Sequence, residues 1–218
     1  MSVTLIIMAL NEADCIHHVL DDIDDSLIDE VLVVDGGSTD GTQEIVERFG
    51  YRVLQQEGSG WGSAFRTGIK YATGDLITLV DADGSYEQKD IPLLLNVLDE
   101  GYDIAYGSRY LAGARSDDDT MIRWFGNMLF TSLVNLVHGV GMSDSLFLFI
   151  AARKQVIESL GLSSTGFELC VEFPIKAHKM GYTFKEIASI EKLRIAGDSK
   201  VNALFDGFRI LKRIFVVR

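Results

Sequence analysis

The sequence predicts an α/β fold in which a mostly parallel central sheet carries helices on both faces. Three observations support this prediction. Short apolar, β-branched runs alternate with longer helix-permissive stretches, two of those runs end in aspartate, and 47% of the 218 residues are hydrophobic. This length and composition suffice for one sizeable domain with a packed core, so we expect a single domain over 1–218.

Five short runs in the first half predict strands, at Val3–Met8, Glu30–Val34, Tyr51–Leu54, Leu76–Val80 and Asp103–Tyr106. The stretches between them predict helices, at about 12–23, 40–49, 62–72 and 88–99. This alternation is typical of parallel strands joined by crossover helices. The first run therefore reads as an internal strand and not as a secretory leader.

The second half is less regular. A polar stretch after Tyr106 contains the acidic run Asp117–Asp119, which reads either as a mobile lid or as a solvated surface. The long apolar segment Met121–Val140 is too polar for a membrane span, and we expect a core helix there more than a helix lying against lipid. A further helix is predicted after Ser164–Glu168 and a strand at Phe184–Ile190.

The last predicted helix, from about Lys200, is amphipathic and basic. It carries apolar residues beside Arg209, Lys212 and Arg213. Such a helix can lie on an anionic membrane face or pack on the domain with its charges solvated, and the sequence leaves both open.

Two predicted strands end in an acid, Asp35 and Asp81. In open α/β sheets the ligand crevice lies beyond the carboxyl ends of the strands, so both acids should face one site. The glycine-rich stretch Gly36–Gly41 supplies a tight turn and a possible helix cap at Ser38 or Thr39. This turn fits the edge of a ligand site, but it fits a capped strand-to-helix turn without a ligand equally well.

Composition excludes several other classes. The net charge of −12 argues against a nucleic-acid groove. The two cysteines, Cys15 and Cys170, signal neither a disulfide framework nor a zinc site, which favours a reducing, cytoplasmic setting. Neither glycine cluster has the spacing of a dinucleotide fingerprint, and no Walker loop occurs.

Asp81 and Asp83 follow a buried strand and precede a helix. Carboxylates at i and i+2 can reach one hard cation that bridges a diphosphate, and Mg²⁺ takes only one or two protein carboxylates. Such a cation neutralises a leaving diphosphate as its bond to a sugar breaks.

The chain resembles family 2 glycosyltransferases of GT-A fold, and within them the dolichyl- and polyprenyl-phosphate sugar transferases. The segments that carry the resemblance are Ile7–Glu12, Val33–Thr42, Arg66–Gly68, Ala72–Asp75, Asp81–Gly84, Gly107–Arg109, Gly126–Asn127, Ser143–Ser145, Gly166–Glu168 and Arg194–Lys200. They run through nearly the whole chain. The resemblance implies an inverting transfer from a nucleoside-diphosphate sugar to a polyprenyl or dolichyl phosphate, assisted by Mg²⁺ or Mn²⁺.

The resemblance also implies roles for individual residues. Leu10, Glu12 and Asp35 would surround the nucleoside, Asp81 and Asp83 would hold the metal, and Arg194 with Lys200 would serve the donor phosphates. Arg109 and Arg123 would meet the acceptor phosphate. An ionised phosphate acceptor needs no strong base, whereas a sugar hydroxyl does, and Asp144 is then the candidate base. The expected catalytic residues are therefore Asp83, Arg109, Arg123 and Asp144.

From the same resemblance we expect a nucleotide-binding half over about 1–107 and an acceptor-side half over about 108–218. The expected location is the cytoplasmic membrane face, with peripheral membrane contact and no nucleic-acid partner. A homo-oligomer or a membrane-protein partner is left open.

Three departures from the family pattern are visible: Met8 in place of Pro, Trp61 in place of Lys, and Phe147–Ile150 in place of Ser-Gly-Phe-Arg. Ser85 stands where some relatives carry a third metal ligand. The altered Phe147–Ile150 stretch keeps open a non-catalytic, nucleotide-binding or regulatory member of the fold. Transfer to a saccharide hydroxyl also stays open. A nucleotidyltransferase ranks last, because Ala9–Glu12 replaces the glycine- and basic-rich loop expected after its first strand.

Overall fold

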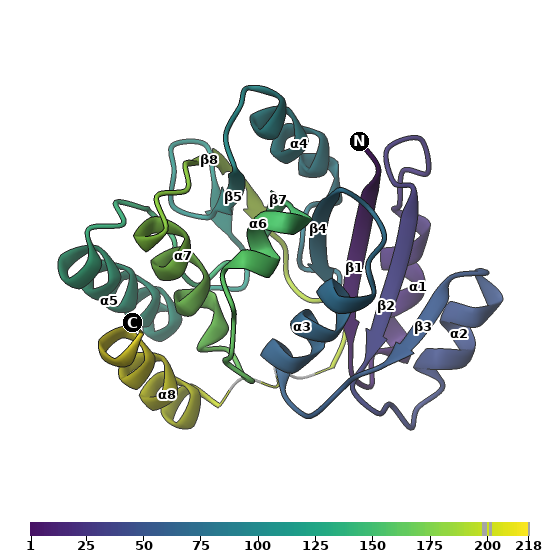
Figure 1. Ribbon diagram of the computed structural model, residues 1–218. Coiled ribbons are helices and arrows are strands. Elements are labelled where there is room, and N and C mark those ends of the chain that lie inside the picture. The colour runs from purple at the N-terminus through teal and green to yellow at the C-terminus, as the bar shows by residue number, and fades with distance from the viewer. Residues whose placement is uncertain (198–199, 201, 218) are drawn as a thin grey trace.

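The computed structural model describes residues 1–197, 200 and 202–217, and its main feature is a seven-stranded sheet with helices on both faces (Figure 1). The strands of this sheet are β1 (Val3–Ala9), β2 (Glu30–Asp35), β3 (Arg52–Gln55), β4 (Leu76–Asp81), β5 (Ile104–Ser108), β7 (Ile150–Arg153) and β8 (Phe184–Ala188). Their order is β3-β2-β1-β4-β7-β5-β8, and every neighbouring pair is parallel except the two that involve β7. The predicted mostly parallel α/β sheet is confirmed.

All five strands predicted in the first half form. β1 and β4 each continue one residue further than predicted, to Ala9 and Asp81. Strand β7 was not predicted, and it is inserted antiparallel between β4 and β5. The strand predicted at Phe184–Ile190 is interrupted at Ser189, because β9 (Ile190–Glu191) leaves the main sheet and pairs with β6 (Arg115–Ser116). The Asp117–Asp119 run therefore directly follows a strand of a small second sheet.

The helices are α1 (Ala13–Asp21), α2 (Thr42–Arg48), α3 (Trp61–Tyr71), α4 (Ile91–Asp99), α5 (Met121–His138), α6 (Lys154–Ser159), α7 (Leu169–Lys179) and α8 (Ala203–Val216), with a short 3₁₀ turn at Gln88–Asp90 before α4. Side chains of β1 alternate between two cores. Ile6 and Met8 pack with residues of α3 and α7, whereas Leu5 and Ile7 pack with residues of α1 and α4. Burial on both faces explains why β1 is an unbroken apolar run.

Helix α5 is not the core helix that its composition predicts. Of its residues only Thr131 and Val134 are buried, whereas Met121, Ile122 and Leu136 are more than four-fifths exposed. The segment is apolar around much of its circumference, so the sequence pattern does not indicate which side packs inward. No helix in the described part of the chain is long and apolar enough to cross a membrane.

Helix α8 lies against α5 and α7, at the opposite end of the molecule from α1 and α2 (Figure 1). Its arginines face the domain. Arg209 Nη2 donates to Glu168 Oε1 at 2.6 Å, and Arg213 pairs with the fully buried Glu172. Helix α8 thus packs on the domain with Arg209 and Arg213 paired, whereas Lys212 is exposed.

Glu172 is the anchor of this contact. Burial alone would raise the pKa of Glu172, but hydrogen bonds from Lys176 and from Ser163 and Ser164 outweigh burial and lower the pKa to about 2. The carboxylate therefore stays ionised on folding and holds α8 to α7 through Arg213.

Candidate active site

The two strand-ending aspartates lie at the same edge of the sheet, as expected. Strand β1 runs between β2 and β4, and the pairing register places Ala9 opposite Asp35 and Met8 opposite Asp81. Because the three strands are parallel, their carboxyl ends meet at one crevice. Gly84, at a φ of 78°, then turns the chain back after Asp83.

A cavity of about 580 Å³ opens at this edge. It contains all of the predicted site residues except Asp35 and Asp144: Leu10, Glu12, Asp81, Asp83, Arg109, Arg123, Arg194 and Lys200 line its wall. Helix α8 adds Asp206, Arg209 and Ile210, none of which was predicted to belong to the site. The i, i+4 spacing of Arg209 and Arg213 was the available signal, since it puts both cations on one helix face.

Asp81 and Asp83 are held differently. Asp81 Oδ1 accepts a hydrogen bond from Trp61 Nε1 at 2.9 Å. Asp83 Oδ1 accepts from the backbone and hydroxyl of Ser85, and its Oδ2 accepts from Arg194 Nη2 at 2.7 Å. Burial, and then the charge of Asp83, raise the pKa of Asp81 to about 7 against the opposing hydrogen bond from Trp61.

This pair suits a divalent cation. Two acidic side chains line one wall of the cavity, and the raised pKa of Asp81 is what a poorly compensated negative charge produces. The donors are hard carboxylate oxygens, which Mg²⁺ and Mn²⁺ prefer, and two of them leave room for phosphate oxygens and water. Ser85 hydrogen-bonds Asp83 and so supports this carboxylate.

Asp35 lies fully buried behind Gly36, which does line the cavity. Its Oδ2 accepts from the backbone of Gly37 and Ser38 and from the Gln43 amide. Its Oδ1 is buried with no hydrogen-bond partner among the described residues. An unsatisfied buried carboxylate oxygen is costly, and Asp35 itself lies outside the cavity lining, so this oxygen does not face the cavity in this structure.

Glu12 lies in the cavity wall beside Arg194 and Lys200. Lys200 Nζ contacts Glu12 Oε1, and Arg194 Nη2 lies 3.7 Å from the same oxygen. Leu10 is 39% exposed on the same wall. Asp198 and Ser199, which belong to the Arg194–Lys200 motif, lie outside the described residues.

Arg109 is buried beside Asp144 and still reaches the cavity. Its Nε donates to Asp144 Oδ2 at 2.7 Å and its Nη2 to Asp144 Oδ1 at 3.0 Å, while its Nη1 lies 3.2 Å from Glu191 Oε2. Asp144 is fully buried, lies outside the cavity lining, and also accepts from the backbone of Leu146. Both oxygens of Asp144 are thus occupied by Arg109 and Leu146, and Asp144 does not face the cavity in this structure.

Arg123, at the start of α5, lines the cavity and pairs with Asp118. Asp119 accepts from the Tyr110 hydroxyl at 2.6 Å and from the Asn127 amide at 3.2 Å. Asp118 and Asp119 therefore belong to the cavity wall, whereas Asp117 is exposed outside it.

The Phe147–Ile150 stretch is buried. The Phe147 ring stacks on Tyr86 at 4.9 Å between centroids, and the guanidinium of Arg109 lies 4.9 Å from the Phe147 centroid. Ile150 begins β7. Phe147 and Leu148, which belong to the stretch that departs from the family pattern, thus form an apolar part of the cavity lining next to Arg109.

Comparison with known proteins agrees with this arrangement. Residues 4–161 match the model of a family described as glycosyl transferase family 2. Glycosyltransferase AglJ of Haloferax volcanii is 31% identical over 216 residues, which cover 98% of this chain and 71% of that protein. The dolichyl-phosphate hexose transferase of the same organism is 32% identical, with 95% and 90% covered. A dolichol-phosphate mannosyltransferase of Pyrococcus furiosus is 29% identical, and the match covers 64% of its length.

Among solved structures, glucosyl-3-phosphoglycerate synthase from Mycobacterium tuberculosis, in complex with Mn²⁺, uridine diphosphate and glucosyl-3-phosphoglycerate, superposes with a TM-score of 0.77. The identity is 20%, and the match covers 98% of this chain and 78% of that one. This likeness concerns the fold, and it confirms the expected GT-A architecture.

Proposed function

This chain belongs to glycosyl transferase family 2, and from that premise we propose that it transfers a sugar, with inversion, from a nucleoside-diphosphate sugar to a polyprenyl phosphate. The observation that carries the proposal is one cavity that is lined both by the carboxylates of Asp81 and Asp83 and by the guanidinium groups of Arg109 and Arg123. A divalent cation and a diphosphate suit the two carboxylates, and an acceptor phosphate suits the two guanidinium groups.

On the donor side, the nucleoside would lie against Leu10 and Gly36, close to Asp35. Asp35 lies behind this wall, and its unpartnered Oδ1 would accept an N–H or O–H of the nucleoside only if the side chains in front of it moved aside. Asp81 and Asp83 would hold Mg²⁺ or Mn²⁺, which supplies charge neutralisation at the diphosphate when bound. Arg194 and Lys200 would add positive charge at the same phosphates.

On the acceptor side, Arg109 is held rigid by Asp144 and Glu191, and Arg123 is more exposed at the rim. A phosphate oxygen is already ionised near neutral pH, so orientation and charge are what these arginines need to supply. The saturated contacts of Asp144 weigh against the alternative of a saccharide hydroxyl acceptor, which needs a free base.

An apolar face beside the cavity supports a lipid-linked acceptor and peripheral contact with the cytoplasmic membrane face. Helices α5 and α8 pack together, both line the cavity, and both expose large apolar side chains. These include Met121, Ile122, Phe125, Leu129, Leu204, Phe205, Phe208 and Phe215. Since Arg209 and Arg213 are paired inside the domain, this face would enter lipid mainly through its apolar side chains.

A transfer assay tests the proposal. The chain is incubated with Mn²⁺, radiolabelled UDP- or GDP-sugars and either undecaprenyl or dolichyl phosphate, and the organic phase is counted. The proposal predicts label in the organic phase only when the lipid phosphate is present. Label appearing instead on a soluble saccharide would favour the hydroxyl-acceptor alternative. Nucleotide-sugar binding without transfer to either acceptor would favour the non-catalytic one.

A further inference from the structure

Trp61, the first residue of α3, occupies a fixed position in the cavity wall. The helix start is pressed onto the segment before α7. A Cβ at Gly60 would lie 2.5 Å from the carbonyl oxygen of Thr165, one at Gly62 would lie 2.7 Å from that of Ser164, and Ser63 N donates to the Thr165 oxygen at 3.1 Å. Glycine at both positions permits this close approach, which restrains the backbone that carries Trp61.

The indole ring of Trp61 is restrained as well. It stacks on Phe167 with centroids 5.6 Å apart and planes 24° apart, and on Phe65 at 6.3 Å and 13°. Its edge donates the 2.9 Å hydrogen bond from Nε1 to Asp81 Oδ1. Within the described residues, this is the one hydrogen bond that the Asp81 side chain accepts, so Oδ2 of Asp81 has no protein donor.

We propose that Trp61 is the positioning residue of the cation site. Its indole N–H holds Oδ1 of Asp81 and thereby presents Oδ2 to a divalent cation shared with Asp83. The inference rests on the proposed cation site but does not depend on sugar transfer.

A neutral donor is suited to this role. Asp83 is paired with the guanidinium of Arg194, which offsets its charge. The indole N–H of Trp61 orients Asp81 without adding a positive charge, so Asp81 keeps its attraction for a cation. Partners that orient a metal ligand typically change metal affinity by about 10- to 100-fold when they are removed.

The test compares two Trp→Phe variants of the full chain. Trp61→Phe keeps a ring against Phe167 but loses the N–H, whereas Trp124→Phe removes the second of the two tryptophans, which lies half-exposed on α5 outside the cavity lining. Mn²⁺ affinity is measured from the electron paramagnetic resonance signal of free Mn²⁺, and the melting temperature is recorded without metal.

The Mn²⁺ dissociation constant should rise about tenfold in Trp61→Phe and stay within twofold of the unmodified chain in Trp124→Phe. A merely structural role for Trp61 would lower the melting temperature and leave the Mn²⁺ affinity unchanged, and that result would overturn the inference. An equal rise in both variants would overturn it too, because the loss would not depend on this hydrogen bond.

A second measurement, on the Trp124→Phe protein, can be made even if Trp61→Phe fails to fold. In the Trp124→Phe protein, Trp61 is the sole tryptophan, and paramagnetic Mn²⁺ bound beside it should quench its fluorescence saturably at the concentration that the resonance titration gives. The absence of saturable quenching would contradict the inference. Normal Mn²⁺ binding and quenching without sugar transfer would refute the proposed function alone.

Discussion

The buried ion pair between Arg109 and Asp144 gives a quantitative prediction. Replacing Asp144 with Asn keeps the size of the side chain but removes its charge and turns an amide N–H₂ toward one of the guanidinium donors. Arg109 is only 7% exposed and Asp144 is fully buried, so water cannot replace the lost partner. Glu191, at 3.2 Å, is the acid left to compensate Arg109.

The expected cost is large. Removing one partner of a buried pair typically costs about 3 to 5 kcal/mol, because it leaves an uncompensated charge, and whole domains are stable by only about 5 to 15 kcal/mol. For a chain of this length each kcal/mol lowers the melting temperature by roughly 2 to 4 °C, which gives a drop of about 6 to 20 °C.

Urea unfolding at pH 7, followed by far-ultraviolet circular dichroism, measures this cost. Glu100→Gln is the matched control, because Glu100 pairs with Lys185 at 2.5 Å but both side chains are about half-exposed. An exposed pair is worth at most about 1 kcal/mol. If Asp144→Asn destabilises the chain no more than Glu100→Gln does, the assignment of Asp144 as the buried anchor of Arg109 is wrong.

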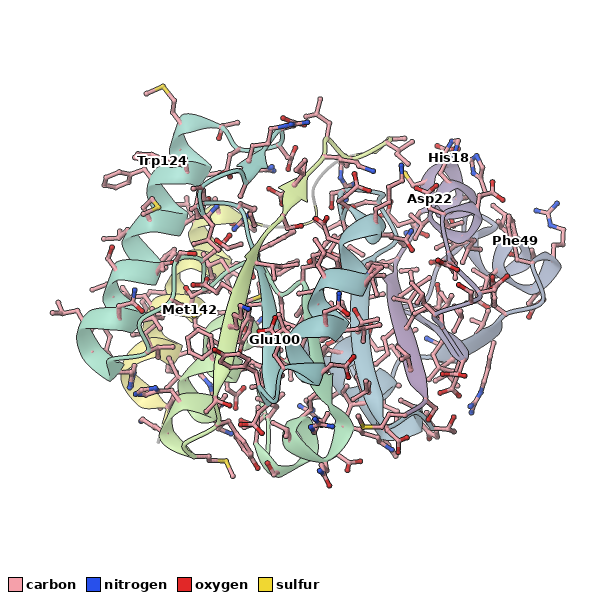
Figure 2. The ribbon with its side chains drawn as sticks, turned by 90° about the horizontal axis from the view of Figure 1, so that it is seen from above. His18, Asp22, Phe49, Glu100, Trp124 and Met142 are labelled. Atoms are coloured by element: carbon pink, nitrogen blue, oxygen red, sulfur yellow. The ribbon has the colours of Figure 1, made fainter. Side chains whose placement is uncertain are left out.

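Three further variants test other parts of the structure. The pKa of Glu172 is lowered to about 2, so its carboxylate should stabilise the fold by about 3 kcal/mol above about pH 4.5 and lose that contribution as the pH falls through 2. In Glu172→Gln, the free energy of unfolding in urea should therefore depend less steeply on pH between pH 5 and 2. Gly60→Ala should cost at least about 2 kcal/mol in the same assay, since its φ of 90° and the facing carbonyl both oppose a Cβ, and an unchanged midpoint would refute that packing. Phe205→Asp combined with Phe208→Asp should weaken sedimentation with neutral lipid vesicles at least about tenfold, whereas Phe49→Asp should not, because Phe49 follows the end of α2 and lies far from Trp124 on α5 (Figure 2); equal losses would argue against the α5 and α8 face.

The strands of the first half could be predicted from the sequence because each contains a short apolar run, and all of them except β3 are largely buried. Asp35 and Asp81 mark two of those ends, and parallel pairing then brings them to one edge. Strand β7 could not be predicted in this way. Its antiparallel position between β4 and β5 depends on pairing with residues far away in the chain, and a local sequence pattern does not indicate such long-range pairing.

The residues of the candidate site could be predicted only in part. The cavity holds Asp81, Asp83, Arg109 and Arg123 together, but the sequence does not reveal that Asp144 is buried under Arg109. Burial of a lone acid depends on its partner, and 35 residues separate the two. The prediction of a core helix at Met121–Val140 failed for a related reason, since a segment that is apolar around much of its circumference does not indicate how much of it packs against the domain.

Cation-dependent nucleotide-sugar binding tests the central claim most directly. The melting temperature of the chain is measured with UDP- and GDP-sugars, each with and without Mn²⁺, and again in Asp83→Ala. At a ligand concentration about 100 times its dissociation constant, binding stabilises the native state by about 2.7 kcal/mol, which corresponds to a rise of roughly 5 to 10 °C. A cation held by Asp81 and Asp83 should give this rise for one nucleotide sugar with Mn²⁺, little rise without Mn²⁺, and none in Asp83→Ala. An equal rise without Mn²⁺ or in the variant would contradict this claim.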